Sequence, residues 1–305
     1  MKKNRPFSKY DFTVPGNKKI RLLIDTDAAN EADDQYAIVH ALLTPKFDVR
    51  GIIAAHFGTR RTENSMNESY DEILKVLDLM QISDQPVFHG APAAMPDEYS
   101  MVPSEGSQAI IDEALKDDPL PLFCIFLGPL TDMASALLAR PEIAERLTVV
   151  WIGGGAWPDG GEEFNLNNDI SAANAVYRSS VELWQVPRPV YNLLKVSLAE
   201  LQVRVKPYGK IGGYLFSQMV EFNDMLAENK GWPLGESWVL GDSAAVGLLL
   251  DQHEYFYDVY KAPIIDKDMK YNHGKSGTGN IRFYKNIDTR FILEDFYCKL
   301  KLFCS

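Results

Sequence analysis

The segment RLLIDTDAANEADDQYAIVHALL, residues 21–43, joins a short apolar run to an acidic loop and then to a segment with helical periodicity. Apolar runs and segments of helical periodicity alternate as far as residue 190, and such runs are typical of parallel strands that helices cover on both faces. The further runs are VRGIIAAH (49–56), PVFHG (86–90), LPLFCIFLG (120–128), LTVVWIGGG (147–155) and VELWQVP (181–187). The pattern predicts an α/β fold with an open, mostly parallel, Rossmann-like sheet.

The carboxyl-terminal third is less regular. It predicts helices at 207–229 and 242–250, a strand in YFYDVYKAPII (255–265), and a final amphipathic segment, IRFYKNIDTRFILEDFYCKLKLF (281–303). No linker or low-complexity stretch divides the chain. We therefore predict a basic amino-terminal tail at 1–19 and a single domain at 20–305 with additional carboxyl-terminal helices.

Composition excludes several classes of partner. Lysine and arginine number 31 against 42 aspartates and glutamates, which gives a formal net charge of −11 and a pI near 5.0. Nucleic-acid phosphates and anionic membranes repel such a chain. Three cysteines do not make a disulfide framework, and no run reaches the length of a membrane span. The sequence predicts a cytoplasmic protein without nucleic-acid or membrane partners.

The loop after the first apolar run carries an unusual concentration of charge. Five carboxylates fall within ten residues: Asp25, Asp27, Glu31, Asp33 and Asp34. Two of them, Asp33 and Asp34, could simply cap the following helix, which would leave the other three unexplained. A hard divalent cation such as Ca²⁺ turns the mutual repulsion of carboxylates into ligation. Metal binding is the interpretation that accounts for the whole loop.

Four motifs in the same order resemble the nucleoside hydrolases, the inosine/uridine-preferring ribohydrolase superfamily. The loop DTDAANEADD is similar to the family's DTDPGxDD, with two extra residues around Glu31. The other three are LGPLTDMA (127–134), EEFNLNNDISAA (162–173) and LGDSAAVGLLL (240–250), similar to GPLTNxA, EFNxxxDPEA and the late HDxxA helix.

The resemblance implies a calcium site, which Asp25 supports from behind. Its ligands would be Asp27, Asp34, the backbone carbonyl of Leu127, and Asp242. The residues themselves agree for Leu127, because a helix beginning at Pro129 leaves the preceding carbonyl at the carboxyl end of a strand. Judged alone, Asp242 also fits a helix N-cap, and both roles can coexist.

The resemblance also implies a sugar site. Asp33, Glu163, Asn165 and Asp242 would contact ribosyl hydroxyls, since carboxylates and amides pair well with vicinal diols. His56 stands where the family has an asparagine after the second strand, so we include it as a substrate-binding candidate. This departure leaves open a sugar other than unmodified ribose.

The implied reaction is hydrolysis of the N-glycosidic bond of a nucleoside or related riboside, with Asp27 as the base that removes a proton from water. Family members are commonly homodimers or homotetramers. The family's histidine before the late aspartate is Gly241 here, so the source of a proton for the leaving base is open. Trp232, Trp238 and His273 could roof that part of the site, although core packing or a surface loop also explains them.

Two alternatives remain open. A calcium-holding relative that binds a sugar or nucleoside without turnover would explain Gly241. Haloacid-dehalogenase-like phosphatases also place DxD after a first buried strand, with Mg²⁺, but they give the three later motifs no role.

Overall fold

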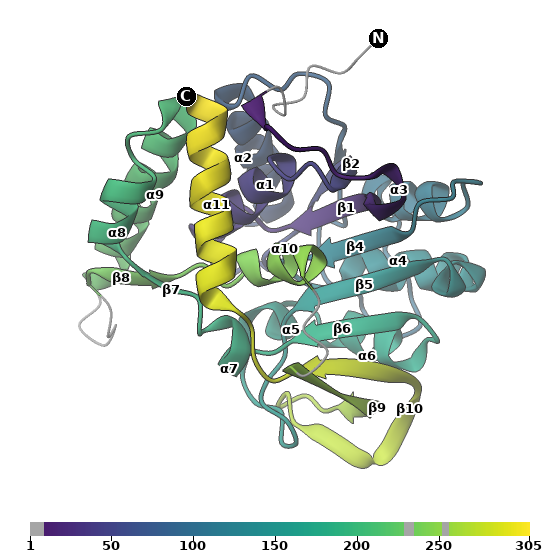
Figure 1. Ribbon diagram of the computed structural model, residues 1–305. Coiled ribbons are helices and arrows are strands. Elements are labelled where there is room, and N and C mark those ends of the chain that lie inside the picture. Colours follow the sequence, from purple (N-terminus) through teal and green to yellow (C-terminus); the bar gives the residue numbers. More distant parts are fainter. Residues whose placement is uncertain (1–8, 229–234, 252–255) are drawn as a thin grey trace.

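The computed structural model describes residues 9–228, 235–251 and 256–305. An eight-stranded sheet forms its centre, in the order β3-β2-β1-β4-β5-β6-β10-β9 (Figure 1). All neighbouring pairs are parallel except β10 with β9 at the edge. The strands are β1 Ile20–Thr26, β2 Phe47–Ala54, β3 Val87–His89, β4 Leu122–Phe126, β5 Leu147–Ile152, β6 Glu182–Val186, β9 Tyr257–Ile265 and β10 Tyr271–Tyr284. The predicted single α/β domain with a mostly parallel sheet is confirmed.

Helices cover both faces of the sheet. Alternate residues of β1 belong to opposite cores, Leu22 and Ile24 to one and Leu23 to the other, because successive side chains of a strand point to opposite faces. The first core is covered by α1 Asp34–Leu42, α2 Ser65–Leu79, α9 Gly209–Ala227, α10 Ser243–Leu250 and α11 Thr289–Cys304. The second is covered by α3 Glu105–Ala114, α4 Thr131–Ala139 and α6 Ile170–Arg178.

Short elements complete the fold. They are α5 Phe164–Asn168, α7 Arg188–Tyr191, α8 Leu198–Arg204, the small antiparallel pair β7 Lys195–Ser197 and β8 Ser237–Val239, and the 3₁₀ turns Gly16–Lys18 and Pro141–Glu145. One boundary differs from expectation: α4 begins at Thr131 instead of Pro129, because Pro129 and Leu130 form the turn that follows β4. The division between a tail at 1–19 and the domain stays a prediction. In the described ranges, no helix has both the length and the apolarity to cross a bilayer.

Parallel topology gathers the loops that matter. The arrowheads of β1, β4 and β5 point to the same edge of the sheet, where the loops after Thr26, Phe126 and Ile152 begin (Figure 1). In an open α/β sheet, ligands bind in the crevice at these carboxyl ends. The acidic loop, the Gly-Pro turn and the EFN segment therefore come together.

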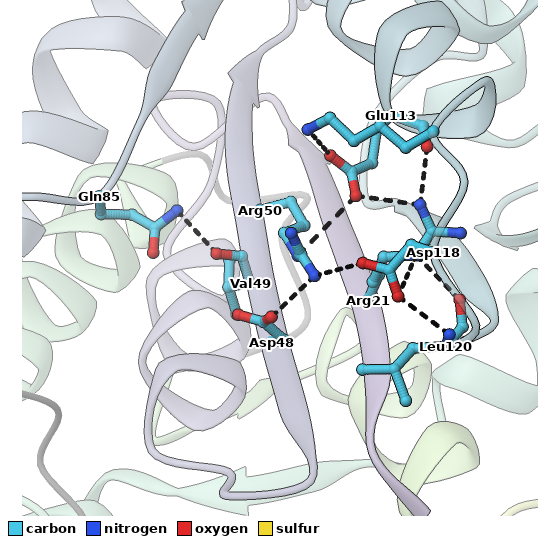
Figure 2. Close-up of polar contacts among 9 residues, drawn as sticks. Arg21, Asp48, Val49, Arg50, Gln85, Glu113, Asp118 and Leu120 are labelled. Atoms are coloured by element: carbon cyan, nitrogen blue, oxygen red, sulfur yellow. Dashed lines mark hydrogen bonds and ion pairs between the residues drawn. The ribbon is translucent and has the colours of Figure 1, made fainter. Parts of the chain in front are cut away.

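An ion-pair network near the amino-terminal end of β1 joins β1 and β2 to α3 (Figure 2). The Arg21 guanidinium donates to Glu113 Oε1 at 3.1 Å and to the backbone carbonyls of Glu113 at 2.7 Å and Leu120 at 2.8 Å. Arg50 extends the network to Asp118 at 2.9 Å. Both Arg21 and Glu113 are only 4% exposed, so loss of this pairing would leave a buried charge with weaker, more exposed partners.

Replacement of Arg21 should destabilise the fold. We expect Arg21→Met to lower the free energy of unfolding by about 3 kcal/mol, because Glu113 loses its buried partner. The more exposed Arg50 and Lys116 would remain beside Glu113 and compensate its charge only in part. Urea denaturation measures the effect. The double variant Arg21→Met/Glu113→Leu should recover much of the loss, and equal stability of the wild type and the single variant would contradict the assignment.

Candidate active site

A pocket opens at the carboxyl ends of β1, β4 and β5. It is lined by backbone and side chains of the acidic loop, the β4 end, the α5 segment, α7 and the start of α10. Six carboxylates contribute to the lining: Asp27, Glu31, Asp33, Asp34, Glu163 and Asp242. The carboxylates come from three separate parts of the chain, which the parallel topology brings to one place.

Three aspartates form a compact group. One carboxylate oxygen from each of Asp33, Asp34 and Asp242 lies within 4.8 Å of the others. Asp33 and Asp242 occupy the N-cap positions of α1 and α10, yet neither side chain makes a capping hydrogen bond. Instead, Asp33 Oδ2 accepts from the backbone N–H of Asp242 at 3.4 Å. Helix capping therefore does not account for this group.

Burial and like charge raise the pKa values of these side chains. Burial is the main cause for Asp34, whose pKa rises from 3.8 to about 6, with hydrogen bonds from Thr26 and Asp242 opposing it. The pKa of Asp242 lies well above its usual range because of burial and then the charge of Asp33. Close negative charges without a cation are costly, so the cluster favours either protons or a positively charged ligand.

Among the carboxylates that line the pocket, Asp27 gives the most direct indication of a cation site. Its side chain is 2% exposed, and its Oδ2 makes no hydrogen bond to any described residue. Gly128 permits the close approach, because a Cβ there would stand 3.0 Å from Asp27 Cγ. A buried carboxylate oxygen without a donor, beside three further carboxylates, fits a divalent cation, whose preferred ligands are such oxygens. These donors do not fix which metal binds.

The far wall of the pocket is built around Glu163. Its two oxygens accept from the backbone N–H groups of Gly154, Asn165 and Leu166 at 2.8–3.2 Å. The Tyr191 hydroxyl donates to Glu163 Oε1 at 2.9 Å. Asn165 Nδ2 donates to the Leu127 carbonyl at 2.6 Å and to that of Ile152 at 2.8 Å. The Oδ1 of Asn165 therefore remains available to accept a hydrogen bond from a ligand.

Comparison with known proteins agrees with this geometry. The family model described as inosine-uridine preferring nucleoside hydrolase matches residues 22–293. The chain belongs to this family. It is therefore a hydrolase that acts on N-glycosyl compounds, and ribonucleosides are the family's substrates. The phosphatase alternative is left without support.

Individual relatives of this nucleoside hydrolase are distant. The pyrimidine-specific ribonucleoside hydrolase RihA of Salmonella arizonae is 23% identical over 83% of this chain and 86% of its own length. A solved plant nucleoside hydrolase superposes with a TM-score of 0.73 at 19% identity, covering 92% of this chain and 99% of its own. The purine-preferring ribonucleoside hydrolase of Gardnerella vaginalis gives 0.74 at 20%, covering 93% and 99%. The two solved structures support the fold.

Most site residues that the sequence singled out lie on the pocket of this nucleoside hydrolase, but two do not. His56 is 1% exposed, lies outside the pocket lining and pairs through Nε2 with Thr131 Oγ1 at 2.9 Å. Burial lowers the pKa of His56 to about 4, so its ring is neutral. Asp25 is buried behind the pocket, where burial and the charge of Asp132 raise its pKa well above the usual range.

The three residues considered for the leaving-group side lie elsewhere or outside the described ranges, and core packing accounts for Trp238. Trp238 is 3% exposed in the core, edge-on to Phe222 at 5.4 Å. His273 contacts the Pro158 carbonyl through Nε2 at 2.7 Å, away from the pocket lining. Trp232 falls outside the residues that the structure describes.

Sequence reasoning missed two features of the pocket. Tyr191 lines the pocket from α7, a segment in which the sequence shows no recognisable motif. Glu31, beside the two-residue insertion, also lines the pocket. Its loop is held by Gln35 Nε2, which donates to the Ala28 carbonyl at 2.6 Å, and by Gln218 Nε2, which donates to the Ala32 carbonyl at 2.8 Å. A long-range contact such as that of Gln218 has no local signal.

Proposed function

We propose that this nucleoside hydrolase is calcium-dependent and cleaves the N-glycosidic bond of ribonucleosides or related ribosides. The observation that carries the proposal is the buried, unpartnered Oδ2 of Asp27 among six pocket carboxylates. Asp27, Asp34, Asp242 and the Leu127 carbonyl would hold the cation, with Asp25 behind them. Asp33 lies close enough to Asp34 and Asp242 to join them, or to bind a sugar hydroxyl.

The other residues of the pocket have separate roles in the proposed hydrolysis. A bound divalent cation would lower the pKa of water, which favours formation of a hydroxide-like nucleophile. Asp27 removes the proton as the water oxygen attacks the anomeric carbon. Asp33, Glu163, Asn165 and Asp242 position the sugar hydroxyls. His56 acts on the sugar side only indirectly, because its ring contacts Thr131 behind the pocket.

The proposal is tested with p-nitrophenyl riboside. We expect clear release of p-nitrophenolate with calcium, loss of it with a chelator, low activity on inosine and uridine, and no activity on p-nitrophenyl phosphate. Low activity on ordinary nucleosides follows from Gly241, which has no proton for a departing base. Hydrolysis of the phosphate, or none of the riboside under calcium, would refute the proposal.

Asn165 separates sugar binding from metal binding. We expect Asn165→Ala to raise KM for p-nitrophenyl riboside about tenfold, because one hydrogen bond to the sugar and the support of the β4 and β5 ends are lost. Calcium affinity, measured by calorimetry, should change much less. A variant that loses calcium as completely as it loses substrate would assign Asn165 to the metal instead.

Assembly and location belong to the same proposal. We infer a cytoplasmic homodimer or homotetramer, as is common among family members. The acidic pI near 5.0 supports the inference that it binds neither nucleic acid nor membrane. Light scattering after size-exclusion chromatography measures the assembly.

A further inference from the structure

Acidic side chains dominate the polar part of the pocket lining. The lining holds six carboxylates and, among the described residues, no lysine, arginine or histidine. Glu163 accepts hydrogen bonds from four protein donors. The Glu31 carboxylate accepts none within the described ranges, and the charge of nearby Arg61 acts on it from outside the lining. Asp27 Oδ2 is likewise without a donor. One divalent cation would balance only part of this charge, so an anionic substrate is disfavoured.

The leaving-group side offers an aromatic ring in place of an acid. A Cβ on Gly241 would stand 2.9 Å from Tyr191 Cδ2 and 3.6 Å from Asp33 Oδ2. The Tyr191 ring thus takes the space that a side chain at 241 would need. Its hydroxyl proton is already committed to Glu163 Oε1. Tyr191 therefore presents a ring to the pocket but no available proton.

We propose, on the basis of the proposed hydrolase function, that the preferred substrates are N-ribosides whose leaving group already carries a positive charge, such as ribosylpyridinium compounds or ribosides of N-alkylated purines. A carboxylate with no hydrogen-bonded protein partner, Glu31, and the ring of Tyr191 suit a flat cation, because aromatic faces attract positive charge. Selectivity then arises from the charge of the leaving group and much less from its shape.

The chemistry of such a leaving group removes the need for an acid. When the bond between the anomeric carbon and the ring nitrogen breaks, the electron pair stays on the nitrogen and neutralises its charge. The water oxygen bonds to the anomeric carbon, and its proton passes to Asp27. The base departs neutral without protonation, whereas an ordinary purine or pyrimidine develops negative charge that Gly241 does nothing to relieve.

A matched pair of probes tests the inference. Nicotinamide riboside is cationic, and its 1,4-dihydro form has the same sugar and substituent without the charge. The two differ in intrinsic reactivity, but this difference is the same for every variant. The change in the ratio of their kcat/KM values between variants therefore reports the pocket alone, and competition against p-nitrophenyl riboside gives their inhibition constants independently of turnover.

We expect the cationic probe to have an inhibition constant at least tenfold lower than that of the neutral one. Glu31→Gln should reduce this ratio of inhibition constants, and the ratio of kcat/KM values, about tenfold. Tyr191→Leu should reduce them as well, and Tyr191→Phe, which keeps the ring, should not. Glu162→Gln is the matched control, because Glu162 is next to Glu163 in the chain and does not line the pocket. Its ratios should equal those of the wild type.

The outcomes separate this inference from the proposed function. Efficient hydrolysis of p-nitrophenyl riboside with equal competition by both probes, or ratios unchanged by Glu31→Gln, overturns the inference and leaves the function standing. Preferred hydrolysis of uridine that Glu31→Gln abolishes also overturns it, because Glu31 would then be protonating a neutral base. Failure to hydrolyse any riboside with calcium present refutes the function and the inference together.

Discussion

Asp27→Asn should lower the rate of riboside hydrolysis at least about 100-fold, the lower end of what a general base contributes. The amide cannot accept the proton of the attacking water, and it offers a cation one neutral oxygen in place of a carboxylate. The substitution is nearly isosteric, so the close packing of Asp27 against Gly128 is kept. Steady-state kinetics with p-nitrophenyl riboside at saturating calcium measures the loss.

Two further measurements make this result interpretable. Calcium affinity, from calorimetry, separates the loss of the base from the loss of a ligand, because kcat at saturating calcium reports the base. Asp159→Asn is a suitable control, since Asp159 is exposed and outside the pocket lining. If Asp27→Asn kept turnover within about threefold of wild type, another group would have to be the base.

Removal of calcium should abolish hydrolysis and lower the melting temperature. A ligand that binds only the folded state contributes about 2.7 kcal/mol of stability at 100 times its dissociation constant. For this chain, calcium also relieves the repulsion among Asp33, Asp34 and Asp242, which burial prevents water from screening. Thermal unfolding with calcium, magnesium or a chelator measures the effect, and greater stabilisation by magnesium would contradict the choice of metal.

The effect of calcium should depend on pH. The pKa of Asp34 is raised from 3.8 to about 6 in the folded protein. Its contribution to the stability of the metal-free protein is therefore complete below about pH 4 and lost as the pH rises through about 6. Calcium must displace the bound protons, so its affinity and its stabilising effect should both be greater at pH 8 than at pH 5. Calorimetry in buffers of different ionisation heats measures the protons released, and a pH-independent affinity would contradict this linkage.

The pyrimidine-specific hydrolase of Salmonella arizonae and the purine-preferring hydrolase of Gardnerella vaginalis are similarly distant from this chain, at 23% and 20% identity. The family model shows the family, and the solved relative at 20% identity supports the fold. We infer that Glu31 and Tyr191 influence which leaving group is preferred. Glu31 lies on the acidic loop and Tyr191 on α7, and the family motifs do not encode how these two side chains reach the pocket.

Local sequence was sufficient for the fold and for most of the pocket. A run such as that at β1 can be recognised from a few consecutive residues, because a strand that is buried on both faces is apolar at successive positions. Once the strands are parallel, their carboxyl ends share one edge, so the loops that begin after Thr26 and Phe126 must meet. Asp27, Asp34 and Leu127 can therefore be placed near one another from the sequence alone, and Asp242 follows from a motif resemblance.

Tertiary structure alone decided what each of the remaining residues contacts. His56 follows a strand like a site residue, but Thr131 on α4 takes its ring nitrogen away from the pocket. Tyr191 has no motif, yet α7 sets its ring against Gly241, where the missing side chain leaves room. Whether Asp33 and Asp242 cap their helices or face each other was likewise undetermined by their N-cap positions. These outcomes depend on packing between segments far apart in the chain, which neither periodicity nor spacing encodes.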